Sequence, residues 1–410
     1  MGSTTIECCR SCGATDLKPI LDLGKQPLAD RLLNEAQLNQ EEPTFPLEVV
    51  FCPQCSLMQI TETVAPEILF SKDYPYFSSF SDHLLKHSKE NVLDIIERQN
   101  LNSESLVIEL ASNDGYLLKN YVEKGIPVLG IDPADGPVKA ARENGVDTLH
   151  NFFSLELAKN LNSEGRMADV IHGNNVLAHV ADTNGFVEGI AQLLKEDGVA
   201  VIEAPYVRDL IDHCEFDTIY HQHLLYLSVT ALDHLFRAHS LYLNEVKELE
   251  IHGGSLRLYV NRYEKVGESV QRLLKQEQDR GIDRLDYYMD FSQRVQDVRT
   301  ELTRMLRKIQ AEGKTIAAYG AAAKGCTLLN FMDLDKGLID FVVDRNVHKQ
   351  GLYMTGQHSP ILPVEALMEQ KPDYVLMLPW NFADEILGQQ QAYREQGGKF
   401  IIPIPNPKIV

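Results

Sequence analysis

Short apolar runs alternate with helix-periodic segments through the middle of the chain. Runs of strand length lie at 106–110, 128–131, 146–150, 169–172 and 199–202. Between them, apolar positions recur every three or four residues, which is typical of amphipathic helices. The alternation predicts an α/β domain built on a doubly wound parallel sheet. An apolar run with a glycine pair, 251–260, is expected to add an antiparallel strand that closes this sheet.

The same kind of pattern returns toward the C-terminus. Residues 267–311 are charged and helix-periodic, so they are expected to form a helical connector. Apolar runs follow at 315–319, 338–343, 373–378 and 399–402. They predict a second Rossmann-like α/β domain.

The first central strand ends in a loop suited to a ligand. Small and turn-prone residues run from Ala111 to Gly115, and a helix is expected to open near Tyr116. The second strand ends in Asp132, where an acid can accept hydrogen bonds from ribose hydroxyls. With one glycine in place of G-x-G-x-x-G, a pyrophosphate cannot approach easily, which disfavours NAD. S-adenosylmethionine (SAM), which has a ribose but no phosphate, fits better; the alternative is an ordinary turn with an exposed acid.

Polar and aromatic residues follow the third and fourth strands. Asn151 and Phe152 could bracket adenine, and Asn174 lies a few residues before His179. A single histidine is usually a surface or core residue, but the carboxyl edge of a sheet favours a functional one. The predicted cofactor-binding residues are Glu109, Ala111, Asn113, Gly115, Asp132, Pro133, Asn151, Phe152 and Asn174.

Two further segments carry candidate chemistry. Tyr220-His-Gln-His223 concentrates groups that can move protons near neutral pH. A metal site is less favoured there because no carboxylate is near, and an incidental polar loop is the alternative. In the second α/β pattern, a small-residue loop containing Lys324 could hold a phosphate, or could be a packing turn. The next strand ends in Asp344 and Arg345.

Cysteines concentrate near the N-terminus in two C-x-x-C pairs. Cys9 and Cys12 form the first pair, and Cys52 and Cys55 form the second. Four thiolates in this arrangement predict a closed, structural zinc site. Disulfides are the alternative, but a reducing cytoplasm disfavours them. The spacing favours Cys9 over its neighbour Cys8 as the ligand.

Composition limits the partners. The formal net charge of −20 argues against nucleic-acid and anionic-membrane surfaces, because phosphates would be repelled. No apolar run is long enough for a membrane span, and the first residues lack the pattern of a signal peptide. We therefore expect a cytoplasmic protein, and we expect it to be a monomer.

Taken together, the motifs resemble one family. The cysteine pairs, Glu109-Leu-Ala-Ser-Asn-Asp-Gly115, Tyr220-His-Gln-His223 and Tyr319-Gly-Ala-Ala-Ala-Lys324 occur in this order along the whole chain. In that order they look like the sugar C3-methyltransferases of deoxysugar biosynthesis, which act on tetronitrose, mycarose and similar branched sugars. The resemblance implies a zinc-binding domain at 1–75, a SAM-dependent methyltransferase domain at 76–265, and a connector with a sugar-nucleotide-binding domain at 266–410.

The resemblance also implies a reaction. The substrate would be a 4-keto-6-deoxyhexose on a nucleoside diphosphate, dTDP or GDP, methylated at C3. A neutral imidazole can remove a proton beside a ketone, so His223 is predicted as the base. The other residues implied around the sugar are Tyr76, His179, Tyr220 and Gln222, with Tyr206, Lys324, Asp344 and Arg345 binding substrate. Gln222 departs from the family, which has glutamate there.

Two alternatives remain open from the sequence. One is a SAM-dependent methyltransferase that transfers to oxygen or nitrogen. The other is a sugar-nucleotide-binding protein without turnover, which the departure at Gln222 keeps in view.

Overall fold

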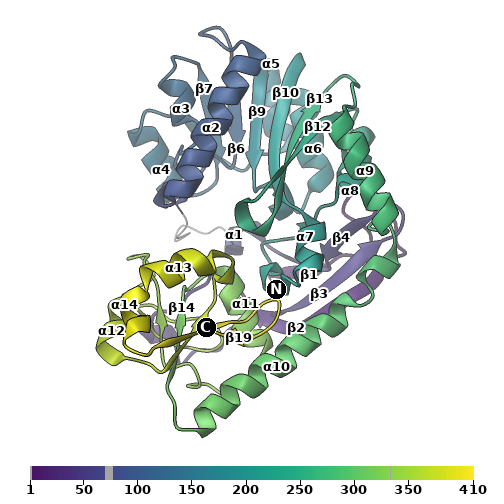
Figure 1. Cartoon of the computed structure of the whole chain (residues 1–410). Helices are drawn as coiled ribbons and strands as arrows, with labels where there is room; N and C mark the ends of the chain where they lie inside the picture. The colour runs from purple at the N-terminus through teal and green to yellow at the C-terminus, as the bar shows by residue number, and fades with distance from the viewer. Residues whose placement is uncertain (1, 70–76, 333) are drawn as a thin grey trace.

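The computed structural model describes residues 2–69, 77–332 and 334–410. Three parts follow one another along the chain: an N-terminal antiparallel sheet, a central sheet with helices on both faces, and a smaller C-terminal α/β unit (Figure 1). Buried side chains from all three parts belong to one continuous hydrophobic core. None of the helices in the described ranges has the length and apolar character of a membrane span.

The central sheet confirms the predicted doubly wound arrangement. In the described chain its strand order is β12-β13-β10-β9-β6-β7-β8, with β10 through β8 parallel. The antiparallel strand predicted near 251–260 is β13, and β12 lies outside it at the edge. The strands are β6 (Val107–Leu110), β7 (Val128–Asp132), β8 (Thr148–His150), β9 (Ala168–Asn174), β10 (Leu194–Pro205), β12 (Tyr242–Leu249) and β13 (Ser255–Asn261).

Helices cover both faces of this sheet. The helix at Asp82–Gln99 is capped by the Ser81 side chain, which accepts a hydrogen bond from the Leu84 N–H. The helix expected near Tyr116 begins at Lys119. The helices are α2 (Asp82–Gln99), α3 (Lys119–Val122), α4 (Asp135–Glu143), α5 (Leu155–Ser163), α6 (Thr183–Leu193), α7 (Val207–Asp212) and α8 (Val229–Ala238).

The predicted helical connector consists of two long helices. They are α9 (Glu268–Arg280) and α10 (Phe291–Ala311). Gly281 ends α9 because it adopts a left-handed φ of 78°, and a short 3-10 helix follows at Leu285–Tyr288. The long α10 then runs beside β2 (Lys18–Pro27) to the C-terminal unit (Figure 1).

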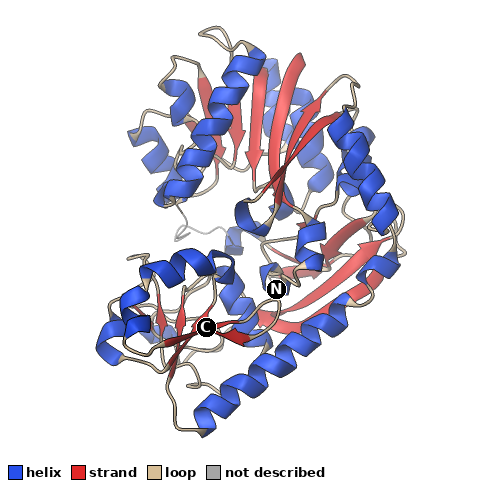
Figure 2. Ribbon diagram, viewed as in Figure 1, coloured by secondary structure: helices blue, strands red, loops and turns tan. Residues whose placement is uncertain are grey.

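The C-terminal unit repeats the α/β plan on a smaller scale (Figure 2). Its described strands follow the order β16-β15-β14-β17-β18-β19, and only β19 is antiparallel. The strands are β14 (Ile316–Tyr319), β15 (Val342–Val343), β16 (Ile361–Leu362), β17 (Tyr374–Met377), β18 (Lys399–Ile402) and β19 (Lys408–Ile409). The helices are α11 (Ala323–Phe331), α12 (Ala366–Gln370), α13 (Ala383–Gln389) and α14 (Gln391–Glu395).

The N-terminal sheet borrows a strand from the central part of the sequence. Its order in the described residues is β11-β4-β3-β2, and β11 (Leu225–Tyr226) begins two residues after His223. Residues 220–226 are therefore held by the N-terminal sheet. The remaining elements are β1 (Ser3–Thr5), β3 (Thr44–Cys52), β4 (Leu57–Ile60), β5 (Glu62–Val64) and α1 (Pro66–Leu69).

Candidate functional site

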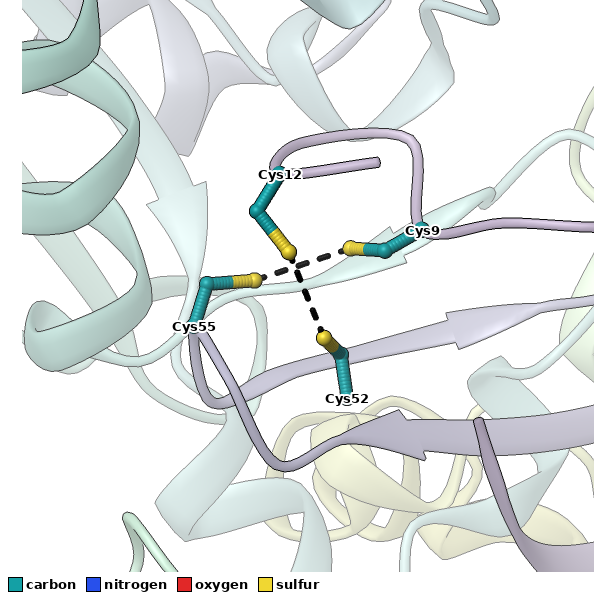
Figure 3. A group of neighbouring side chains, drawn as sticks. All are labelled: Cys9, Cys12, Cys52 and Cys55. Atoms are coloured by element: carbon teal, nitrogen blue, oxygen red, sulfur yellow. Dashed lines mark hydrogen bonds between the residues drawn. The ribbon is translucent and has the colours of Figure 1, made fainter. Parts of the chain in front are cut away.

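Two tight turns bring the four cysteines of the N-terminal part together. Both turns need a left-handed residue after the second cysteine, and Gly13 (φ 74°) and Ser56 (φ 60°) supply it. The four Sγ atoms lie within 4.8 Å of one another. Figure 3 shows them converging on one point, with Cys9 Sγ 3.6 Å from Cys55 Sγ and Cys12 Sγ 3.5 Å from Cys52 Sγ.

The electrostatics of this cluster fit a divalent cation. Hydrogen bonding from the Cys55 thiol lowers the pKa of Cys9 to about 4, and the same contact raises the pKa of Cys55. Burial raises the pKa of Cys52 to about 11. Neighbouring thiols in this arrangement ionise together only when a metal ion offsets their charge. Thiolates at these separations suit tetrahedral zinc, in which Zn–S bonds are about 2.3 Å.

At the carboxyl edge of the central sheet, the loop after β6 wraps around Asp132. Ala111, Asn113 and Gly115 all have positive φ, and a Cβ on Gly115 would lie 2.9 Å from the Val146 side chain. The Asn113 N–H donates to Asp132 Oδ2 at 2.9 Å, and the Ala134 N–H donates to Oδ1 at 2.8 Å. The acid is thus fixed at the end of the second strand, as an acid that holds ribose must be.

Three carboxylates around this loop lack sufficient positive partners. Burial raises the pKa of Glu109 well above its usual range, and the charges of Asp132 and Asp114 raise it further. Burial also raises the pKa of Asp132. Within the described residues, Glu109 Oε2 and Asp114 Oδ1 are buried without a hydrogen-bond partner. The ammonium, sulfonium and ribose hydroxyls of SAM are the donors and positive charge that such acceptors require.

The other predicted cofactor residues lie around the same strand ends. The Asn151 N–H donates to the Asp132 carbonyl oxygen at 3.0 Å, which places the third strand end beside the second. Phe152 is 40% exposed, so its ring is accessible to a ligand. Pro133 accepts a hydrogen bond from His150, and Asn174 ends β9 with a buried Oδ1 that has no partner among the described residues.

His223 is held with one ring nitrogen turned toward the backbone. Its Nδ1 lies 2.8 Å from the Thr218 carbonyl oxygen, which can only accept, so Nδ1 carries the proton. Nε2 is then the basic nitrogen in the neutral ring, and it lies 2.9 Å from the Tyr220 hydroxyl. This tautomer is the one that a general base needs.

His179 faces this pair from a short 3-10 helix, Leu177–His179, after β9. The ring centroids of His179 and His223 are 4.8 Å apart, edge to face. Burial lowers the pKa of His179 to about 4, so the ring is neutral at physiological pH. The structure therefore brings three of the predicted residues, His179, Tyr220 and His223, into one cluster.

The structure does not place the other two predicted residues, Gln222 and Tyr76, in this cluster. Gln222 is 6% exposed, and its side chain hydrogen-bonds Asp30. Burial raises the pKa of Asp30, although Lys349 and this hydrogen bond act in the opposite direction. The orientation of His223 comes from Thr218 rather than from the Gln222 side chain. Tyr76 lies outside the described residues.

Lys324 has protein partners in this structure. Its Nζ lies 3.7 Å from Asp217 Oδ2, donates to Asn381 Oδ1 at 3.1 Å, and sits 4.1 Å from the Trp380 ring centroid. The Trp380 indole N–H also donates to Asp217 Oδ2, at 2.7 Å. Lys324 therefore lies in the first turn of α11 rather than in the predicted loop, and it joins this helix to the chain that leads into Tyr220.

Asp344 repeats the geometry of Asp132. Its Oδ2 accepts from the Ala321 N–H in the loop after the first strand, and its Oδ1 accepts from the Asn346 N–H, both at 2.7 Å. Arg345 lines a neighbouring cavity of 640 Å³ with Tyr319, Gln350 and Gln389. The C-terminal unit thus carries a second acid at the end of a second parallel strand, beside an open cavity.

Tyr206 is not exposed to a ligand. It is 2% exposed, and its hydroxyl donates to Glu277 Oε1 at 2.8 Å. The fold uses it to join α7 to α9, because a buried phenol needs a hydrogen-bond acceptor.

Several residues of the site were not predicted from the sequence. Asp217 is fully buried between Trp380 and Lys324, and its place one turn before Tyr220 was a usable signal. Asn113 Oδ1 accepts from the Ser78 N–H at 2.9 Å, so the segment before α2 covers the SAM loop. The Thr218 carbonyl had no signal, because any residue carries that acceptor.

A parallel sheet whose second-strand acid is held by the loop after the first strand, next to buried carboxyl oxygens of Glu109 and Asp114 that have no partner among the described residues, is the arrangement expected of a SAM-dependent methyltransferase. Family models agree with this class and with the other two parts. The model described as "Methyltransferase domain" matches residues 84–246, "Putative zinc binding domain" matches 9–70, and "C-methyltransferase C-terminal domain" matches 250–405. SAM and zinc are therefore the cofactors.

The whole chain has a full-length relative. That relative is the C-methyltransferase NovU of Streptomyces niveus. The two sequences are 34% identical over 408 residues, and the alignment covers 99% of this chain and 97% of NovU. The chain belongs to the C-methyltransferase family that includes NovU, and it is a SAM-dependent C-methyltransferase. A shorter match, 27% identical over 97 residues, is to the ubiquinone biosynthesis O-methyltransferase of Bartonella quintana and covers 23% of this chain and 39% of that protein.

Solved methyltransferase structures align with less than half of the chain. Magnesium protoporphyrin IX methyltransferase (ChlM) of Synechocystis PCC 6803 with bound SAM aligns with a TM-score of 0.34 and 15% identity, over 44% of this chain and 79% of that one. A SAM-dependent methyltransferase of Clostridium acetobutylicum aligns with a TM-score of 0.35 and 13% identity, over 45% and 92%.

Proposed function

We propose that this C-methyltransferase deprotonates and methylates C3 of a 4-keto-6-deoxyhexose carried on a nucleoside diphosphate. We expect dTDP as the nucleotide, with GDP as the alternative. The observation that carries the proposal is the His223–Tyr220–His179 cluster at the edge of the SAM domain. It contains a neutral base and two polar groups, which is the set that proton removal beside a ketone requires.

His223 takes the C3 proton on Nε2. Its Nδ1–H stays hydrogen-bonded to the Thr218 carbonyl oxygen, which supports the imidazolium as it forms. Tyr220 and the neutral His179, which both lie beside His223, would donate hydrogen bonds to the developing enolate oxygen at C4. Tyr76 is proposed to join them.

Bound SAM supplies an electrophilic methyl group, so that the C–C bond to C3 forms as the S–CH₃ bond breaks and S-adenosylhomocysteine leaves. The glycine and left-handed residues of the 111–115 loop, together with Asp132, orient that methyl donor. Holding both substrates in line accounts for much of the rate, because the reaction becomes effectively intramolecular.

The nucleotide is proposed to extend toward the C-terminal unit. Asp344 has the geometry of a ribose acceptor, and Arg345 lines the cavity beside it. The Phe77 and His348 rings lie 6.4 Å apart, so the loop after β15 faces the segment that covers the SAM loop. A ligand on Asp344 would therefore lie on the side of the molecule that faces the methyl donor. For Lys324 to bind the nucleotide, its ammonium group would have to leave the Asp217 carboxylate and contact a phosphate instead.

Mass spectrometry with a panel of dTDP- and GDP-linked 4-keto-6-deoxy sugars tests the proposal. In D₂O without SAM, the accepted sugar should gain one deuterium at C3. With SAM it should gain one methyl group on carbon. Methyl transfer without C3 exchange would contradict the mechanism. Binding of both ligands without exchange or transfer would instead indicate a sugar-nucleotide-binding protein. We further infer that the enzyme works as a monomer in the cytoplasm, which light scattering and cell fractionation would check.

A further inference from the structure

The zinc-binding cysteines and the active-site histidines are joined by a continuous set of hydrogen bonds. We propose that Gln59 and Arg10 are positioning residues for His223 and His179: they couple the zinc-binding cysteines to the strand pair β4–β11, which holds the chain beside both histidines. The inference rests on the proposed function only in assigning these histidines to catalysis.

The first link is at the metal ligands. Gln59 is fully buried in β4, and its Nε2 donates to Cys9 Sγ at 3.2 Å. Its Oε1 accepts from the Arg10 backbone N–H at 3.1 Å and from the Arg10 guanidinium at 3.4 Å. Hydrogen bonds from outside the ligand set orient metal-binding residues, so Gln59 fixes the first cysteine pair relative to β4.

Arg10 extends the contact along the same edge. It lies inside the first cysteine pair and is 9% exposed. Its guanidinium donates to the carbonyl oxygens of Ile60 and Glu62 and to the Thr63 hydroxyl. A buried charge satisfied by this strand ties the cysteines to β4 strongly.

The second link leads from β4 to the histidines. Gln59 is paired with Leu225 and Met58 with Tyr226 in the antiparallel β4–β11 ladder. The Ile60 N–H donates to the Leu224 carbonyl oxygen at 3.0 Å, and the Leu224 N–H donates to the Ala178 carbonyl oxygen at 2.7 Å. Leu224 therefore lies between β4 and the residue before His179.

A third contact reaches His223 itself, and a fourth holds the cysteine turn to the SAM domain. The Tyr226 hydroxyl donates to the His223 carbonyl oxygen at 3.0 Å. The Asn184 side chain at the start of α6 donates to the Arg10 and Ser11 carbonyl oxygens at 2.9 and 3.0 Å. The turn at Cys9–Cys12 is thus linked to the 3-10 helix that carries His179 through β4 and Leu224, and to the start of α6 through Asn184.

The test uses Gln59→Leu in the full-length, zinc-loaded protein, with Gln26→Leu as the matched control. Gln26 is also a buried glutamine of the same sheet, but it lies in β2 and donates to the Leu23 carbonyl oxygen instead. Each variant is measured for zinc content, SAM affinity, C3 deuterium exchange in the sugar, and amide hydrogen exchange of peptides covering 176–180 and 218–226.

We expect Gln59→Leu to keep zinc and SAM affinity, to exchange the amides of both peptides about tenfold faster, and to lose about tenfold in the rate of C3 exchange with little change in KM. Gln26→Leu should leave all four unchanged. A zinc-loaded Gln59→Leu protein with parental amide exchange would overturn the proposal, as would equal effects in the control.

Arg10→Lys keeps the charge but not the planar fork, and the same expectation applies to it if Gln59→Leu does not fold. If the parent protein turns over none of the keto sugars, the proposed function fails while amide exchange still decides the coupling. The two failures are therefore distinguishable.

Discussion

At the scale of single residues, the Thr218 carbonyl oxygen decides what His223 can do. It accepts from Nδ1 and leaves Nε2 basic beside Tyr220. His223→Asn should reduce C3 deuterium exchange and methyl transfer by about 10²–10⁴-fold, the range for loss of a general base. The measurement is the rate of both reactions in the variant and the parent. Exchange at the parental rate would remove His223 as the base and favour His179 or Tyr220.

Gln222→Glu is the companion change. A carboxylate beside His223 would favour charge on the imidazole and leave the rate unchanged or raise it. The Gln222 side chain hydrogen-bonds Asp30, and the His223 ring is held by the Thr218 carbonyl oxygen, so an unchanged rate is the nearer expectation. The change at His223 should in either case be the more damaging of the two. A Gln222→Glu enzyme slower than His223→Asn would contradict this order.

Asp132 and Asp344 make a matched pair for the two ligands. Asp132→Ala should weaken SAM binding by about 1–3 kcal/mol, because a buried hydrogen-bonded acceptor is lost. Sugar-nucleotide affinity should hardly change. Asp344→Ala should weaken sugar-nucleotide binding and leave SAM affinity nearly unchanged. Calorimetry with each ligand measures both, and equal losses for both ligands in either variant would contradict the separate assignments.

At the scale of elements, the turn between α7 and Tyr220 contains a carboxyl group, Glu215, whose charged form is disfavoured by burial. Burial raises the pKa of Glu215 from its ordinary value of 4.5 to about 8, although Lys324 acts in the opposite direction. Between these values the folded chain holds a proton that the unfolded chain has released. Stability from this group therefore falls as pH rises from 4.5 to 8.

Glu215→Gln removes that dependence while keeping the size of the side chain. At pH 8 the variant should be more stable than the parent by about 1–3 kcal/mol, and below the ordinary carboxyl pKa the difference should vanish. Denaturant unfolding across this pH range measures it. Glu196→Gln, at an exposed position, is the control. Identical pH profiles for the parent and Glu215→Gln would contradict the prediction.

At the scale of the whole molecule, the N-terminal sheet contacts both the four clustered cysteines and the segment that carries His223. One zinc per chain should co-purify on Cys9, Cys12, Cys52 and Cys55. Cys52→Ser should lose the metal and destabilise the N-terminal part, because metal binding and folding are coupled there. Cys8→Ser, at the exposed neighbouring cysteine, should keep it. Elemental analysis and thermal unfolding check both variants, and native protein without zinc would end the assignment.

Contacts between the three parts explain why the chain works as one enzyme. Thr327 in α11 donates to the Ile219 carbonyl oxygen at 3.1 Å, and Trp380 donates to Asp217. The C-terminal unit therefore touches the chain immediately before Tyr220, while the N-terminal sheet holds the chain immediately after His223. Residues 220–223, which we propose to be catalytic, are therefore held at both ends by parts that flank the SAM domain in sequence.

The sequence by itself determined the features that depend on local pattern. The apolar runs predicted the parallel strands, because strands buried on both faces must be apolar throughout. The spacing within Cys9–Cys12 and Cys52–Cys55 predicted the metal cluster, since each pair closes a turn by itself. Asp132 was predicted as the second-strand acid, and the structure places it at that strand end.

Only the tertiary structure decided the contacts between distant segments. No local pattern places β11 beside β4, Asp30 beside Gln222 or Trp380 beside Asp217. The division of the connector after Gly281 and the hydrogen bond of Tyr206 to Glu277 likewise appear only in the folded chain. These features arise from the packing of three parts into one core, and their energies depend on partners that lie far away in the sequence.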